Sequence, residues 1–359
     1  MKSFNNYIVN TCQLIENAKN IKNAIGNKCK LCAVVKANAY GLGLESACKS
    51  LKGIADFFAC ACLKEALSIR VFDKETPILI LGHISSEDVD IVADNNISIS
   101  IGNLTQLHEL IRTVKKRINI HLQVNTGLNR YGFRSINEFV KALDVIENNK
   151  YINLEGVYTH FATKENDVMF VNKQFLRFLQ FKKKVAKKDV IFHSANSYAT
   201  TIDKYRLDMV RAGYLLYGYM DNKFGNKPVV SITSQIVNIL DVKRGDTIGY
   251  DRTFKANKSM KIAVIPVGYA DGYNRRLSNK FYVLISGKKY RIVGMICMDV
   301  FMIDITGCDF KVGQKVTLLG ENGGDKIKLS DMASVVDTSP YEIICNFNYK
   351  RMNYIQKNK

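Results

Sequence analysis

Short apolar, β-branched segments alternate with longer segments of helical period between about residues 30 and 215. The apolar segments are LCAVV, FFACA, PILIL, ISISI, NIHLQV, LEGVYTH, VIFHS and DMVRAG. Between them lie amphipathic segments such as SSEDVDIVAD and SINEFVKALDVIENN, each opening on a serine that can cap a helix. About eight strands alternating with helices in this length favour a parallel (β/α)8 barrel. An open doubly wound sheet is the alternative, although it more often carries a glycine-rich turn after its first strand.

The pattern differs on both sides of this region. At the N-terminus, YIVNTCQLIENAKNIKNAI has apolar residues at helical spacing and predicts a helix. The segment DNKFGNKPVV, at residues 221–230, is rich in Gly, Pro and Asn and marks a boundary. Beyond it, SITSQIVNIL, KIAVIPVGY, FYVLISGKKYRIVG, KVTLLG and EIICNF predict strands, and LSDMASVV predicts one short helix. We therefore expect an N-terminal barrel over residues 1–225 and an all-β domain over residues 226–359.

Length and composition agree with a folded protein of two domains. The chain has 359 residues, 47% of them hydrophobic and 24% charged, which is typical of globular proteins. No signal sequence or membrane-spanning segment is recognisable, so we expect a cytoplasmic protein without a membrane partner. The nine cysteines lie mostly in apolar runs such as FFACAC, which favours reduced thiols. The CKLC segment has no second pair to complete a metal site, so no metal is expected.

The net charge of +19 raises the question of nucleic-acid binding. However, the lysines are dispersed, and short runs such as FKKKVAKK fit the solvated face of an amphipathic helix. We therefore expect no nucleic-acid partner.

Polar residues gather at the predicted carboxyl ends of the barrel strands, where barrel active sites lie. They are Lys36, Arg130, His160, His193, Ser197 and Arg211. A lysine that is partly buried among other cations loses proton affinity, and its neutral amine can then react with a carbonyl group. A lone lysine in this place can instead extend its ammonium group to water.

The segment AVVKANAYGLG, which contains Lys36, is similar to the cofactor-lysine motif of bacterial alanine racemases, which are fold type III pyridoxal-phosphate enzymes. Further segments resemble family motifs in the same order along the chain: NTGLNRYGF, VYTHFA, HSANS, DMVRAGYLLYG, GYDRTF, VGYADGYNRRL and GMICMD. The resemblance implies a homodimeric isomerase that uses pyridoxal 5'-phosphate and interconverts L- and D-alanine for peptidoglycan. It also implies a barrel followed by a β domain.

The resemblance assigns a role to individual residues. Lys36 would bind the cofactor and act as one acid/base group, and Tyr250 of the partner subunit would be the second. Two groups are needed because inverting Cα requires a proton donor on each face. Arg211 would face the pyridine nitrogen and leave it unprotonated, which favours racemisation over transamination. His160 would lie near the phenol and the ring, and His193 is either a core histidine or a partner of Arg211.

The resemblance also implies residues that bind the phosphate and the substrate. The phosphate would meet the hydroxyls of Tyr40, Ser197 and Tyr349 and the backbone amides near Gly213 and Tyr214. The substrate carboxylate would meet Arg130 and the Met298 amide, with Tyr269 at the entrance; Met298 and Tyr269 would come from the partner.

Four features depart from the family pattern. Gln123 stands where many members carry a carbamylated lysine that orients the arginine corresponding to Arg130. Asn125 replaces a usual aspartate, Asp251 replaces a common glycine, and the first strand of the β domain looks shortened. Either an anion such as chloride or another acceptor orients Arg130, or Arg130 lies differently and substrate preference changes.

Three alternatives to alanine racemisation follow from these observations. One is a serine racemase or a racemase of broader specificity, because a small pocket rejects an added hydroxyl poorly. The second is a non-catalytic pyridoxal-phosphate carrier protein, against which the β domain argues. The third is a decarboxylase of basic amino acids, which is expected to place a carboxylate where Arg211 lies.

Overall fold

The computed structural model describes residues 3–163, 167–220 and 223–358, and these form two compact units. The barrel unit comprises Leu14–Ala39 and Gly43–Lys227, and the β unit comprises residues 3–13, Tyr40–Leu42 and residues 228–358. The chain passes between them at Lys227 and Pro228, close to the expected boundary between residues 225 and 226. We expected the N-terminal residues in the barrel, but residues 3–13 belong to the β unit.

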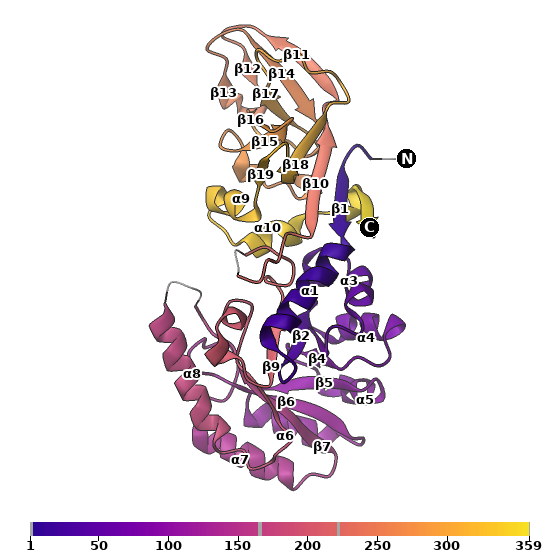
Figure 1. Ribbon diagram of the computed structural model, residues 1–359, viewed down its shortest axis with the longest axis vertical. Helices are drawn as coiled ribbons and strands as arrows, with labels where there is room; N and C mark the ends of the chain where they lie inside the picture. Colours follow the sequence, from indigo (N-terminus) through magenta and orange to yellow (C-terminus); the bar gives the residue numbers. More distant parts are fainter. Residues whose placement is uncertain (1–2, 164–166, 221–222, 359) are drawn as a thin grey trace. The chain divides into compact units, whose positions relative to one another are not determined.

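Eight parallel strands form the sheet of the barrel unit, in the order β8-β7-β6-β5-β4-β3-β2-β9 (Figure 1). They are β2 (Lys30–Val34), β3 (Phe57–Cys60), β4 (Ile78–Ile80), β5 (Ile97–Ile101), β6 (Ile118–Val124), β7 (Ile152–Thr159), β8 (Ile191–His193) and β9 (Met209–Ala212). The outer strands β8 and β9 are joined by hydrogen bonds from the Asp208 amide to the Phe192 carbonyl and from the Arg211 amide to the Ala195 carbonyl, both 3.0 Å. The sheet is therefore a nearly closed barrel, and each strand coincides with a predicted segment.

Helices cover the outside of this sheet (Figure 1). They are α3 (Leu44–Leu51), α4 (Leu63–Phe72), α5 (Val89–Asp94), α6 (Leu104–Thr113), α7 (Ile136–Glu147) and α8 (Val168–Lys182). The predicted serine caps are present, since Ser135 accepts a hydrogen bond from the Glu138 amide and Ser85 accepts one from the Glu87 amide. In the described part of the chain, no helix has both the length and the apolar composition needed to cross a membrane.

The β unit is built on a mainly antiparallel sheet in the order β11-β14-β17-β16-β15-β18-β10-β1-β20, with β19 paired to β18. Its strands are β1 (Asn6–Asn10), β10 (Val230–Gln235), β11 (Asn238–Val242), β14 (Met260–Ile265), β15 (Tyr282–Ile285), β16 (Lys288–Val293), β17 (Phe301–Asp304), β18 (Lys315–Asn322), β19 (Asp325–Ile327) and β20 (Asn353–Lys357). Two short strands, β12 (Thr247–Ile248) and β13 (Phe254–Lys255), pair separately. Two helices complete the unit, α9 (Leu329–Val336) and α10 (Pro340–Asn346).

Two predictions at the ends of the chain are wrong. The first residues of the predicted N-terminal helix form β1, in which alternate residues Tyr7 and Val9 are buried; the helix α1 (Thr11–Ile25) follows it. All five residues of β1 pair with β20. The segment EIICNF lies in α10 rather than in a strand, because Pro340 occupies the first helical turn and the Ser339 hydroxyl caps it.

Candidate active site

Lys36 stands just beyond β2, at the start of an unusual backbone turn. Residues 37–40 all have positive φ, between 53° and 55°. This left-handed conformation costs a residue with a side chain about 1–2 kcal/mol. The Glu65 carboxylate supports the turn by accepting hydrogen bonds from the amides of Ala37 (2.7 Å) and Ala61 (2.8 Å). Such strain persists where the surrounding structure enforces it, and it is typical of functional sites.

Arg211, on β9, is only 3% exposed and is held by several acceptors of the barrel interior. One terminal nitrogen donates to Nδ1 of His193 (2.8 Å) and to its carbonyl (3.1 Å). The other donates to the Thr159 carbonyl (2.7 Å), with Nδ1 of His160 at 3.4 Å and the Ser194 carbonyl at 3.5 Å. Within the described chain, the remaining N–H of Arg211, on Nε, makes no hydrogen bond. This N–H can therefore serve a bound molecule.

His160 follows β7 and lies among the predicted cationic residues. Burial lowers its pKa, and the charges of Arg211, Arg130 and Lys36 lower it further, to about 3. Because a guanidinium group only donates hydrogen bonds, Nδ1 of His160 accepts from Arg211 and its proton lies on Nε2. The structure thus brings Lys36, Arg130, His160 and Arg211 together, with His160 as a neutral imidazole.

The neutral state of His160 predicts a loss of stability in acid. Below its ordinary pKa of about 6.5, the unfolded chain binds a proton at this histidine that the folded chain does not bind until about pH 3, so the free energy of unfolding falls as the pH falls. The contribution reaches about 2 kcal/mol at about pH 5. In urea unfolding at a fixed protein concentration, His160→Gln should lose that much less stability between pH 7 and about pH 5 than the parent protein does.

The control for this measurement is His108→Gln, because His108 is exposed on α6. It should keep the acid sensitivity of the parent protein. Equal slopes for the parent and both variants would contradict the assignment of His160 as a buried neutral group.

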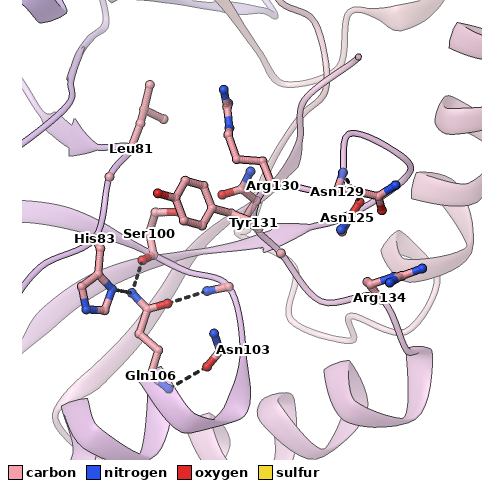
Figure 2. A pocket seen from close by; sticks show the side chains of 14 residues that line it. Leu81, His83, Ser100, Asn103, Gln106, Asn125, Asn129, Arg130, Tyr131 and Arg134 are labelled. Atoms are coloured by element: carbon pink, nitrogen blue, oxygen red, sulfur yellow. Dashed lines mark hydrogen bonds between the residues drawn. The ribbon is translucent and has the colours of Figure 1, made fainter.

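A cavity of about 350 Å³ lies beside Arg130, at the carboxyl ends of β4 to β6 (Figure 2). Arg130 makes no ion pair with a carboxylate of the described residues. Gln123, which replaces the family lysine, is 4% exposed, and its Oε1 accepts a hydrogen bond from the Tyr158 hydroxyl at 3.0 Å. The same hydroxyl lies 2.7 Å from Oγ of Ser100. Gln123 is therefore fixed as a neutral acceptor, and the cavity wall carries no acidic side chain.

Asn125, the second departure on this wall, shapes the loop that leads to Arg130. Its Oδ1 accepts hydrogen bonds from the amides of Gly127 and Asn129, both at 3.1 Å. An aspartate oxygen could accept the same hydrogen bonds. Asparagine in place of the usual aspartate therefore removes a negative charge and keeps the turn.

The predicted phosphate donors of the barrel unit lie close together. The Gly213 amide donates to Oγ of Ser197 at 3.0 Å, and Tyr214 is 8% exposed. The remaining two hydroxyls belong to the β unit. There, Tyr349 packs against Tyr7 with ring centroids 6.0 Å apart, and Tyr40 packs against Tyr341 at 5.9 Å.

The residues assigned to the partner subunit are exposed on the β unit. Tyr250 is 68% exposed, Met298 53% and Tyr269 43%. Their loops lie close together. A Cβ at Gly268, next to Tyr269, would lie 2.1 Å from the Met298 carbonyl oxygen, so only glycine fits there, and a Cβ at Gly249, next to Tyr250, would lie 3.1 Å from the Met295 amide nitrogen. Likewise, the Tyr269 amide donates to the Cys297 carbonyl at 3.1 Å. The motifs GYDRTF, VGYADGYNRRL and GMICMD thus meet on this unit.

Three side chains of the barrel interior escaped our sequence analysis: His121, Glu155 and Tyr158. Tyr158 stacks on His193, with ring centroids 4.8 Å apart, and lies 5.1 Å from the Arg211 guanidinium carbon. A signal was present, because polar residues interrupt NIHLQV and LEGVYTH, which otherwise read as buried strands.

Known proteins match both units of the chain. Residues 9–221 match the family model of the alanine racemase N-terminal domain, and residues 229–355 match that of the alanine racemase C-terminal domain. The chain is 36% identical over 355 residues to alanine racemase 2 of Caldanaerobacter subterraneus subsp. tengcongensis, covering 95% of this chain and 92% of the relative.

Two solved structures extend the comparison. Alanine racemase from Bacillus anthracis with bound L-Ala-P has a TM-score of 0.92 and 32% identity, and the match covers 100% of this chain and 96% of that one. Histidine racemase from Leuconostoc mesenteroides subsp. sake has a TM-score of 0.88 and 28% identity, over 98% of this chain and 97% of that one.

Proposed function

The chain belongs to the alanine racemase family of isomerases, and from this premise we propose that it is a pyridoxal-phosphate-dependent racemase that interconverts L- and D-alanine. The observation that carries the proposal is the buried Arg211. Its two terminal nitrogens donate hydrogen bonds to acceptors of the barrel, and its Nε–H remains available to a ligand. A guanidinium group at this position suits a ring nitrogen that keeps its lone pair.

The chain's residues fit pyridoxal 5'-phosphate. The Arg211 Nε–H can donate to the pyridine nitrogen, and Lys36 can supply the amine that the aldehyde needs. Hydroxyls and amides without a bulky cation suit the phosphate, and we assign this role to Tyr40, Ser197, Tyr349, Gly213 and Tyr214. When bound, the cofactor withdraws electrons from Cα of the amino acid and so acidifies the α-proton.

The proton transfers need one group on each face of the amino acid, and we assign them to Lys36 and to Tyr250 of the partner subunit. Each group takes the α-proton in one direction of the reaction and returns a proton in the other. The exposure of Tyr250 on the β unit supports the assignment, because it leaves the phenol accessible to a second subunit. The neutral His160 can donate its Nε2–H to a phenolate and so support that tyrosine.

Arg130 would hold the substrate carboxylate, together with the Met298 amide and with Tyr269 at the entrance, both from the partner. Gln123 is neutral, and no carboxylate of the described residues pairs with Arg130. The full positive charge of Arg130 is therefore available to the substrate carboxylate. The family's carbamylated lysine has no equivalent here, because glutamine cannot be carbamylated.

We propose alanine as the substrate because the curated relative and the Bacillus anthracis structure bear that name. A serine or broader specificity is the second candidate, favoured by the polar cavity beside Arg130 and by the similarity to a histidine racemase. The likeness to racemases over both units argues against a carrier protein, and Arg211 argues against a decarboxylase.

The cellular role follows from the proposed reaction. D-alanine would be supplied to peptidoglycan, and we place the enzyme in the cytoplasm because none of the nine cysteines, all within the described residues, is in a disulfide.

The test is to incubate the protein, purified with pyridoxal phosphate, with L-alanine, L-serine or L-histidine in D₂O, and to record α-proton exchange and formation of the D-enantiomer. We expect exchange with inversion, fastest for alanine. A faster reaction of serine or histidine would replace alanine as the substrate. Cofactor binding without exchange of any of them would contradict the proposed function.

A further inference from the structure

A chain of hydrogen-bonded side chains in the barrel interior connects Arg211, on β9, with Glu155, on β7. Arg211 donates to Nδ1 of His193 at 2.8 Å, Nε2 of His193 lies 2.8 Å from Nδ1 of His121, and Nε2 of His121 lies 2.9 Å from Oε2 of Glu155. Ser98 donates to the same carboxylate oxygen at 2.5 Å. Both imidazoles are fully buried. Four strands, β9, β8, β6 and β7, thus contribute one member each.

The hydrogen bonds in this chain determine where the protons lie. A guanidinium group has only donors, so as long as Arg211 is bonded to Nδ1 of His193 this nitrogen accepts and the proton of His193 lies on Nε2; a proton on Nδ1 would break the bond to Arg211. That proton is donated to Nδ1 of His121, so the proton of His121 also lies on Nε2. It is donated in turn to Glu155, which accepts as a carboxylate. Replacing the acceptor at Glu155 would therefore change the tautomer of His121 and, through it, the tautomer of His193.

The backbone is adapted to this arrangement at one point of β7. The register with β6 shifts between Ile120 and His121, so that Glu155 is an extra residue between Leu154 and Gly156. A bulge of this kind redirects a side chain, here that of Glu155 to His121. Gly156 leaves room for the imidazole, because a Cβ there would lie 2.2 Å from Nδ1 of His121.

The electrostatics agree with these proton positions. Burial lowers the pKa of His193, and the charge of Arg211 lowers it further, so the ring stays neutral. Burial alone would raise the pKa of Glu155, but the hydrogen bonds from His121 and Ser98 outweigh it and keep the carboxyl ionised. One end of the chain is thus a cation and the other an anion, and the His193 ring between them is neutral.

We propose that Glu155 and His121 are positioning residues for the reaction: they fix the tautomer of His193, which in turn holds the Arg211 guanidinium so that its Nε–H faces the cofactor ring. Neither residue reaches the reacting atoms. This proposal rests on the proposed function for the position of the cofactor. The tautomers of His121 and His193, in contrast, are properties of the protein that do not depend on the proposed function.

A graded pair of variants tests the proposal. Glu155→Leu removes the acceptor, whereas Glu155→Gln keeps an acceptor oxygen without the charge. Loss of a hydrogen bond to a charged group corresponds to about tenfold or more in rate, so kcat of Glu155→Leu should fall by about that factor. KM should stay within about twofold, because Arg130 binds the substrate, and Glu155→Gln should recover most of kcat. Glu147→Gln, on the exposed end of α7, is the control and should match the parent.

Two spectroscopic readouts distinguish positioning from a merely structural role. The chain has five histidines, so ¹⁵N-histidine labelling of the full-length protein purified with pyridoxal phosphate gives few signals. We expect His121 and His193 as Nε2–H tautomers in the parent and a changed tautomer of His193 in Glu155→Leu. We also expect the absorbance band of the bound cofactor to shift in Glu155→Leu and not in Glu155→Gln.

A second variant covers the case in which Glu155→Leu fails to fold. Gly156→Ala displaces the His121 ring sterically and should produce the same change in the His193 tautomer and the same fall in kcat. An Nδ1–H tautomer of His193 in the parent would overturn the proposal. So would parental tautomers and a parental kcat in a folded Glu155→Leu or Gly156→Ala protein. Since the tautomers are observed without turnover, a protein that racemises no amino acid but shows this dependence would refute the proposed function only.

Discussion

Replacing Lys36 with alanine is expected to abolish the yellow absorbance of protein-bound pyridoxal phosphate and to lower racemisation by at least about a thousandfold. Lys36 is the group to which we assign both the attachment of the cofactor and one proton transfer, so the variant loses both. The measurement is the absorbance spectrum of the protein purified with excess cofactor, followed by the D₂O exchange assay with L-alanine.

The matched control is Lys64→Ala, an exposed lysine at the start of α4. It removes the same side chain from the same unit and should retain both the spectrum and the activity. If Lys36→Ala still formed the yellow species, another amine would hold the cofactor and the strained turn at residues 37–40 would need a different explanation.

The barrel could be predicted because its signal is local. Segments such as ISISI and NIHLQV are buried over almost their whole length, as strands covered on both faces must be, and serines before α7 and η1 (Ser86–Asp88) marked the helix starts. The failures came where tertiary pairing decides the structure. Residues 6–10 have a mixed pattern, and they form a strand because β10 and β20 offer them partners on both sides.

The site was predicted from residue type at strand ends and from motif resemblance. These identified Lys36, His160 and Arg211, which the structure brings together. They missed Glu155, because its direction depends on a bulge in β7 that shifts the register by one residue. A strict alternation of inward and outward side chains along a strand takes no account of such a shift, and so it does not predict that Glu155 and His121 face each other. Gly156 marked the place, since glycine inside a strand often indicates a bulge or a close approach.

Tyr250→Phe tests the second proton donor. Without the phenol, one face of the amino acid has no group to take or return a proton, so we expect racemisation to fall by about 10²–10⁴-fold in both directions. Lys36 remains, so one enantiomer should still exchange its α-proton with D₂O without inversion. Tyr250→Phe should keep the cofactor spectrum of the parent. Racemisation at the parental rate in both directions would exclude Tyr250 as an acid/base group.

Mixing the two inactive variants decides whether a site is shared between subunits. In a heterodimer of Lys36→Ala and Tyr250→Phe, one site carries both defects, whereas the other combines the intact lysine of one subunit with the intact tyrosine of its partner. Random reassembly after dissociation makes half of the dimers mixed, so roughly a quarter of the parental activity should return. If each subunit used its own Tyr250, every site would keep one defect and no activity would return. The recovery therefore tests the exposed position of Tyr250 on the β unit as a contribution to a second copy of the chain.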